Sequence, residues 1–173
     1  MSSGRTIAIG DIHGCQVALE TLLEAVAPAA DDRFVILGDV IDRGPGTRQV
    51  IDRLLTLRTE CRVVHLMGNH EEMFLDALGG GSWQQSWLSY GGLQMLESYG
   101  GTVADIPSDH LDFIRGGKDY FETDTEIFVH GFLRPQVPVD HEHSQWLRWS
   151  RFEPTGQPHA SGKRVICGHT AQS

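Results

Sequence analysis

Carboxylate, amide and imidazole side chains recur in short glycine-containing motifs along the chain. The motifs are Gly10-Asp11-Ile12-His13-Gly14, Gly38-Asp39, Gly68-Asn69-His70, His130-Gly131 and Gly168-His169. Oxygen and imidazole ligands without a thiolate suit Mn, Fe or Zn, and they argue against a structural zinc site or a copper site. Glycine allows the tight turns that bring the backbone close to a ligand. These residue types predict a metal site.

The spacing of the motifs suggests how two ions would be shared. Asp11 and His13 are two residues apart on an extended segment, so their side chains point to the same side and can hold one ion. We expect Asp39 to bridge both ions through its two oxygens, and Asn69, His130 and His169 to complete the second. The predicted cofactor is two divalent ions, with Mn²⁺ expected and Fe or Zn as alternatives.

Such a pair of ions would support phosphate chemistry. Two metals about 3.5 to 4 Å apart deprotonate a bridging water at neutral pH and hold the phosphoryl oxygens of an in-line displacement. His70 follows a proposed ligand directly, so we expect it to protonate the leaving group without binding metal. Asp42 could orient His70 and raise its pKa. Arg43 offers a planar guanidinium for the phosphate.

Elements that alternate between strand and helix must position these residues. β-Branched apolar runs predict strands at Thr6–Ile9, Arg33–Leu37, Arg62–Met67, Glu126–His130 and Arg164–Cys167, each running into one motif. Helical spacing predicts helices over Gln16–Ala27 and Thr47–Thr59, and a third from Glu71 to the glycines at 79–81. Glu71 is interpreted as a first-turn residue that complements the helix dipole. Because open α/β sheets bind ligands at the carboxyl ends of their strands, we expect all five motifs at one sheet edge.

Length and composition restrict the class of protein. The chain has 173 residues, of which 40% are hydrophobic and 21% charged, as in an ordinary globular domain. We expect one domain over residues 1–173, with 82–125 as an insertion over one end of the sheet that contains a helix at Ser108–Arg115. The net charge of −9 argues against binding to a nucleic-acid backbone. No apolar run approaches the ~18 residues of a membrane span, so we expect a cytoplasmic protein; the sequence leaves its oligomeric state open.

The motifs, taken in order, resemble the signatures of the phosphoprotein phosphatase family within the calcineurin-like metallophosphoesterases. The compact bacterial and phage serine/threonine phosphatases are the most similar in pattern. The motifs that match are Gly10-Asp11-Ile12-His13-Gly14, Gly38-Asp39-Val40-Ile41-Asp42-Arg43-Gly44, Gly68-Asn69-His70-Glu71, Val129-His130-Gly131 and Gly168-His169-Thr170, with a further likeness at Trp87-Leu88-Ser89-Tyr90-Gly91-Gly92. The resemblance implies an α/β fold with a layered β-sheet core flanked by helices and a metal site at the strand C-terminal ends.

The resemblance also implies roles for individual residues. Asp11, His13 and Asp39 would hold the first metal, and Asp39, Asn69, His130 and His169 the second. His70 with Asp42 would be the acid pair, and Arg43 a phosphate ligand. The family places a second arginine after a tryptophan, which favours Arg151, in Trp149-Ser150-Arg151, over Arg148.

The chain departs from the family pattern in three places, one of which is Ser89, where an amide is common. Phe132 follows His130-Gly131, where the family usually has Ala-Gly or Gly-Gly, so its ring would crowd the phosphate or pack beneath the site. The sequence given ends four residues after His169, whereas relatives continue through further strands. We therefore expect either missing C-terminal strands or a sheet that closes differently.

The expected function is hydrolysis of phosphomonoesters, with phosphoserine or phosphothreonine in proteins, or a small phosphoester, as substrate. The alternative is a nucleotide hydrolase that resembles the symmetrical diadenosine tetraphosphatases. Those relatives tend to have Ala-Arg-Gly and Asn-His-Asp where this chain has Asp42-Arg43-Gly44 and Asn69-His70-Glu71. A third alternative is a catalytically idle binding module, although a pseudoenzyme would be expected to lack one of the ligands or the acid.

Overall fold

The computed structural model describes residues 4–153 and 157–171, which include two three-stranded sheets. The first sheet consists of β1 (Thr6–Ile9), β2 (Arg33–Ile36) and β3 (Arg62–His65) in that order, with all strands parallel. The second consists of β4 (Tyr120–Glu122), β5 (Glu126–Val129) and β6 (Arg164–Cys167). In this sheet β4 is antiparallel to β5, and β5 is parallel to β6. The expectation of one shared sheet edge is therefore wrong, because β5 and β6 belong to a separate sheet.

The central strand β2 shows why the core is layered. Phe34 and Ile36 are buried in the cluster that includes the helices, whereas Val35 and Leu37 are buried in a second cluster with Phe128 of β5. Alternate residues of a strand face opposite sides, so β2 is covered on both faces, as is usual for parallel strands. One face packs on helices and the other on the second sheet, which confirms the predicted layered α/β architecture.

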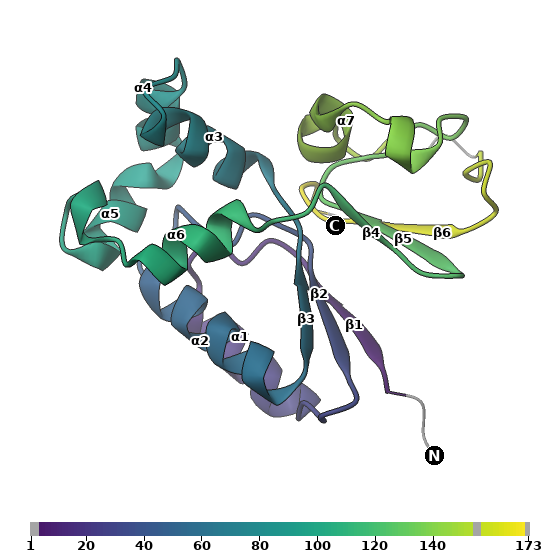
Figure 1. Cartoon of the computed structure of the whole chain (residues 1–173), viewed down its shortest axis with the longest axis horizontal. Helices are drawn as coiled ribbons and strands as arrows, with labels where there is room; N and C mark the ends of the chain where they lie inside the picture. The colour runs from purple at the N-terminus through teal and green to yellow at the C-terminus, as the bar shows by residue number, and fades with distance from the viewer. Residues whose placement is uncertain (1–3, 154–156, 172–173) are drawn as a thin grey trace.

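Helices on one side of the first sheet join its parallel strands (Figure 1). They are α1 (Gln16–Val26) and α2 (Thr47–Glu60), and α3 (Asn69–Leu78) follows β3. In α2 the residues Val50, Ile51, Leu54 and Leu57 are completely buried, which matches their helical spacing.

The segment from 82 to 125 contains more helix than its sequence predicted. It forms α4 (Gln84–Trp87), the π-helical turn η1 (Leu88–Gly92), α5 (Leu93–Tyr99), the short turn η2 (Val103–Asp105), α6 (Ser108–Arg115) and then β4. Both α5 and α6 contact α2, and Figure 1 shows α5 on the side of the molecule opposite the second sheet. Only α6 was predicted, because the other turns are short and interrupted by glycine.

The outer face of the second sheet is covered by η3 (Val139–His141) and α7 (Ser144–Trp149), neither of which was predicted. Val139 and Leu147 pack with Ile127 and Val129 of β5 in one apolar cluster.

The thiols of Cys15, Cys61 and Cys167 are free. Among the helices of the described residues, none has both the length and the apolar character needed to cross a membrane.

Candidate metal centre

The five predicted motifs follow the carboxyl ends of β1, β2, β3, β5 and β6, and their side chains converge in one region between the two sheets. Two groups of side chains have atoms within 4.8 Å of one another that could hold a metal. The first group is His13, Asp39 and His70, and the second is Asp39, His130 and His169. Asp39 belongs to both groups, which is the position expected of a bridging ligand.

The histidines present lone pairs to this carboxylate. The Nδ1–H of His130 donates to the carbonyl oxygen of Leu37 (2.7 Å), which leaves Nε2 facing Asn69 Oδ1 at 3.0 Å and Asp39 Oδ1 at 3.4 Å. His13 repeats the pattern, because its Nδ1–H donates to the Ile41 carbonyl (3.0 Å) and its Nε2 lies 3.6 Å from Asp39 Oδ2. A backbone carbonyl that fixes the tautomer in this way is typical of metal-ligating histidines.

The protonation states suit a cation. Burial is the main influence that lowers the pKa of His13 to about 4, and it also lowers the pKa values of His130 and His169. These rings are therefore neutral near pH 7, and buried Nε2 of His13 has no hydrogen-bond partner among the described residues. Burial raises the pKa of Asp39 to about 7, with the Asp11 carboxylate acting in the same direction. Above this pH the Asp39 carboxylate and the neutral imidazoles are electron-pair donors that face one another, an arrangement that fits a divalent ion.

Asp11 lies at the wall of the adjoining cavity and outside both clusters. Its Oδ1 accepts a hydrogen bond from the backbone N–H of His169 (2.9 Å) and lies 4.0 Å from Nδ1 of His130. The cavity has a volume of about 320 Å³ and is also lined by Asp39, Arg43 and Arg151. The structure thus places every proposed metal ligand within the same small region.

His70, Asp42 and Trp87 form a buried hydrogen-bonded chain beside the clusters. Nδ1–H of His70 donates to Asp42 Oδ2 at 2.7 Å, and the indole N–H of Trp87 donates to both Asp42 oxygens at 3.0 and 3.1 Å. Burial acts to lower the pKa of His70, but the hydrogen bond to Asp42 and the nearby charge of Asp39 outweigh it, so the pKa is raised. At its other nitrogen, Nε2, His70 accepts from the Arg43 guanidinium at 3.1 Å.

The two candidate arginines have different surroundings. Arg148 donates to Glu72 Oε1 at 2.7 Å and pairs with Asp119, so it joins α7 to α3. Arg151 instead lines the cavity together with Arg43. The geometry therefore favours Arg151 over Arg148 for contact with a substrate in this cavity.

Glu71 is a positioning residue that the sequence interpretation missed. Its carboxylate is fully buried and accepts hydrogen bonds from the backbone N–H groups of Asp39 (2.9 Å), Val40 (2.8 Å), Ile41 (3.3 Å) and Gly68 (3.0 Å). It thereby supports the loop in which Asp39 has a positive φ of 48°, a conformation unusual for a residue other than glycine. The only sequence signal was a glutamate three residues after the N-cap position, which is typical of a capping box.

Comparison with known proteins adds a family and a set of relatives. The model of the calcineurin-like phosphoesterase family matches residues 4–173. A symmetrical bis(5'-nucleosyl)-tetraphosphatase of Burkholderia pseudomallei is 34% identical over 79 residues, which cover 46% of this chain and 27% of the relative. The match thus spans about a quarter of the length of that curated relative.

Solved structures are similar over more of the chain. One described as a putative diadenosine tetraphosphatase has a TM-score of 0.68 and 26% identity, and the match covers 96% of this chain and 75% of that one. A protein serine/threonine phosphatase from Saccharomyces cerevisiae has a TM-score of 0.52 and 13% identity over 86% of this chain and 45% of its own. At that identity the second likeness concerns the fold alone.

Proposed function

The chain belongs to the calcineurin-like phosphoesterase family, and we propose that it is a metal-dependent hydrolase of dinucleoside polyphosphates. The observation that carries this proposal is the cavity in which Arg43 and Arg151 both lie beside Asp39 and His169. Two guanidinium groups next to a metal cluster suit a substrate with several linked phosphates. The likeness to two tetraphosphatases supports the same substrate class.

The residues present would hold two divalent ions, for which we expect Mn²⁺, with Fe or Zn as alternatives. Asp39 would contact both, Asp11 and His13 the first, and Asn69, His130 and His169 the second. Bound there, the ions would polarise phosphoryl oxygens and lower the pKa of a coordinated water. The carbonyl group of Ile41 holds the imidazole of His13, and that of Leu37 holds the imidazole of His130, each with Nε2 toward Asp39.

The remaining residues would bind the phosphates and donate a proton to the leaving group. Arg43 and Arg151 bind phosphate oxygens through charge-assisted hydrogen bonds. Asp42, held by Trp87, orients the ring of His70 and favours its protonated form. When a phosphate draws Arg43 away from His70, Nε2 can hold the proton that the leaving group needs.

A second candidate is hydrolysis of phosphoserine or phosphothreonine monoesters. The specific observation in its favour is the buried His70–Asp42 pair, with 2.7 Å between Nδ1 and Oδ2. The alkoxide released from such an ester is a far stronger base than a released nucleotide, so it depends more on a general acid.

Parallel turnover assays would separate the two. Purified chain with added Mn²⁺ should hydrolyse a dinucleoside tetraphosphate with kcat/KM at least about tenfold above that for a phosphoserine or phosphothreonine peptide, a 1.4 kcal/mol preference in the transition state. An Asp39→Asn preparation, purified in the same way, controls for contaminating phosphatases. The opposite preference would establish the second candidate instead, and activity on neither substrate would point to the binding module.

Metal content is the companion measurement. Elemental analysis of the purified chain should find two divalent ions per protein, and should identify which of Mn, Fe or Zn they are. A chain that hydrolyses phosphoesters at full rate after exhaustive chelation would refute the metal-dependent mechanism.

A further inference from the structure

Phe132 is a residue at which the chain departs from the family pattern, and the proposed chemistry does not use it. It follows the anchored His130 by two residues, and its ring lies edge-to-face with that of Phe152, with centroids 5.6 Å apart and planes at 82°. Both rings line a cavity of about 520 Å³ outside the metal centre. This volume lies within the ~300–1,000 Å³ typical of small-molecule sites.

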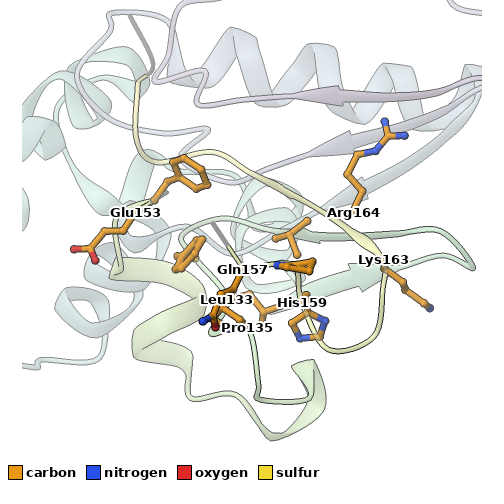
Figure 2. Close-up of a pocket in the computed structure, with 11 residues that line it drawn as sticks. Leu133, Pro135, Glu153, Gln157, His159, Lys163 and Arg164 are labelled. Atoms are coloured by element: carbon orange, nitrogen blue, oxygen red, sulfur yellow. The ribbon is translucent and has the colours of Figure 1, made fainter. Parts of the chain in front are cut away.

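Apolar side chains make up much of the wall of this aromatic cavity, with Glu153, Gln157 and His159 among its polar lining residues. Leu133, Pro135 and His159 gather in it, whereas the side chains of Lys163 and Arg164 turn outward (Figure 2). The Lys163 amine is engaged elsewhere, because it donates to the Thr123 carbonyl (2.6 Å) and pairs with Glu122 (3.0 Å). A flat, uncharged group therefore fits the interior better than a phosphate or a charged side chain.

A third cavity, the intermediate cavity, has lining residues in common with both the aromatic cavity and the cavity at the metal centre. It has a volume of about 310 Å³ and is lined by Trp146, with the Arg134 guanidinium 5.1 Å from the Trp146 ring centroid. It shares Arg151 with the metal cavity, and it shares Phe132 with the aromatic cavity. The intermediate cavity therefore adjoins the arginines of the metal cavity through one shared side chain and the two phenylalanines through another.

We propose that the aromatic cavity binds the nucleobase of the nucleotide whose phosphates lie at the metal centre. This inference rests on the proposed function and names the part of the substrate that the metal centre does not contact. A nucleobase is planar and aromatic, so it can stack on Phe132 or Phe152, and each such contact is worth a substantial gain in affinity. The ribose and phosphates that connect the nucleobase with the metal centre would lie in the intermediate cavity beside Arg151. An apolar side chain of a phosphopeptide is the competing occupant.

The test compares two ligands that share a phosphorylated ribose and differ in the base. Adenosine 5′-monophosphate and ribose 5-phosphate are titrated by calorimetry into the metal-loaded full chain. The parent should bind the nucleotide more tightly by roughly 5- to 150-fold, the range for one stacking contact. Phe152→Ala, at a ring that is 37% exposed, should remove most of that difference and leave ribose 5-phosphate affinity unchanged.

Two further variants make the result specific. Phe132→Leu keeps an apolar side chain of similar bulk in the half-buried position, so its loss of the base-dependent affinity would come from the missing ring rather than from unfolding. Leu93→Ala, at a residue of α5 that is 53% exposed, is the matched control and should bind both ligands as the parent does. In steady-state assays the phenylalanine variants should raise KM for a dinucleoside tetraphosphate, whereas Leu93→Ala should leave that KM as in the parent.

The outcomes separate this inference from the proposed function. Equal affinity of the parent for the two ligands would overturn the nucleobase site, and so would phenylalanine variants that bind both ligands as the parent does. Active hydrolysis of the dinucleoside tetraphosphate in that case would leave the proposed function intact. A parent that neither binds nor hydrolyses dinucleoside polyphosphates, and binds only phosphopeptides with an apolar neighbouring residue, would overturn both.

Discussion

Glu71→Gln changes one atom in a carboxylate whose two oxygens each serve two backbone donors. Oε1 accepts from Val40 and Ile41, and Oε2 accepts from Asp39 and Gly68. In either orientation, the new amide NH₂ faces two N–H groups that have lost their acceptor. A buried donor without a partner costs about 1–3 kcal/mol, so two cost about 2–6 kcal/mol.

Two considerations place the expected loss in the lower half of that range. The Ile41 hydrogen bond is long, at 3.3 Å, and removing the charge relieves repulsion between Glu71 and Asp39. Burial is the main cause that raises the pKa of Glu71 to about 7, and the Asp39 charge acts in the same direction. The comparison should therefore be made at pH 8, where the carboxylate of the parent is ionised.

Urea unfolding of the chelated protein, followed by tryptophan fluorescence, measures this loss. Glu24→Gln, at an exposed position of α1, is the matched control and should stay within about 0.5 kcal/mol of the parent. Because Glu71 anchors the backbone of Asp39 in its left-handed conformation, Glu71→Gln should also weaken Mn²⁺ binding under conditions in which the protein remains folded. Unchanged stability together with unchanged Mn²⁺ affinity would refute the positioning role.

Four other predictions concern the metal centre and its neighbours. Asp39→Asn should abolish both Mn²⁺ retention and turnover, measured by elemental analysis after dialysis and by phosphate release. Mn²⁺ affinity should fall as pH drops below about 7, because protons compete with the metal for Asp39, while His13, with a pKa lowered to about 4, stays neutral. Calorimetry across pH 5–8 should show this fall in affinity. An affinity independent of pH would contradict the prediction. His70→Asn should keep its metals but slow hydrolysis of an alkyl phosphate ester by roughly 10² to 10⁴, and a rate equal to that of the parent would exclude the acid role. Trp87→Phe should cost about 1–3 kcal/mol of unfolding free energy, since Asp42 loses the indole donor, and a thermal melt identical to that of the parent would argue against this contact.

Much of the fold could be predicted from local pattern. The β1 bounds Thr6–Ile9 and the β6 bounds Arg164–Cys167 are those that the apolar runs predicted, and α1, α2 and α6 match to within a residue or two. These elements have the periodic burial that a sequence records directly. The short strand β4 and the helices α4, α5 and α7 were missed, because their few turns contain too little periodicity to stand out.

The sequence by itself determined which residues could do the chemistry. The motifs contain the ligand types, place each after a strand, and identify the family through their order. The ligands could be predicted from the sequence because ligand identity and the transition from strand to turn are local properties of the chain. The preferred substrate was harder to predict from the sequence, because bound metal ions polarise the phosphoryl oxygens of phosphomonoesters and of phosphate anhydrides alike.

Only the tertiary structure decided how those residues meet. The Nδ1 of His130 is fixed by the carbonyl of Leu37, which is 93 positions away, and the loop of Asp39 is supported by Glu71, which is 32 positions away. The division of the strands into two sheets, and the cavities that bring Asp39 beside Arg151 and Phe132 beside Phe152, likewise arise from packing between distant segments. Hydrogen bonds and cavities of this kind depend on which surfaces are buried together, and no local pattern in the chain records that choice.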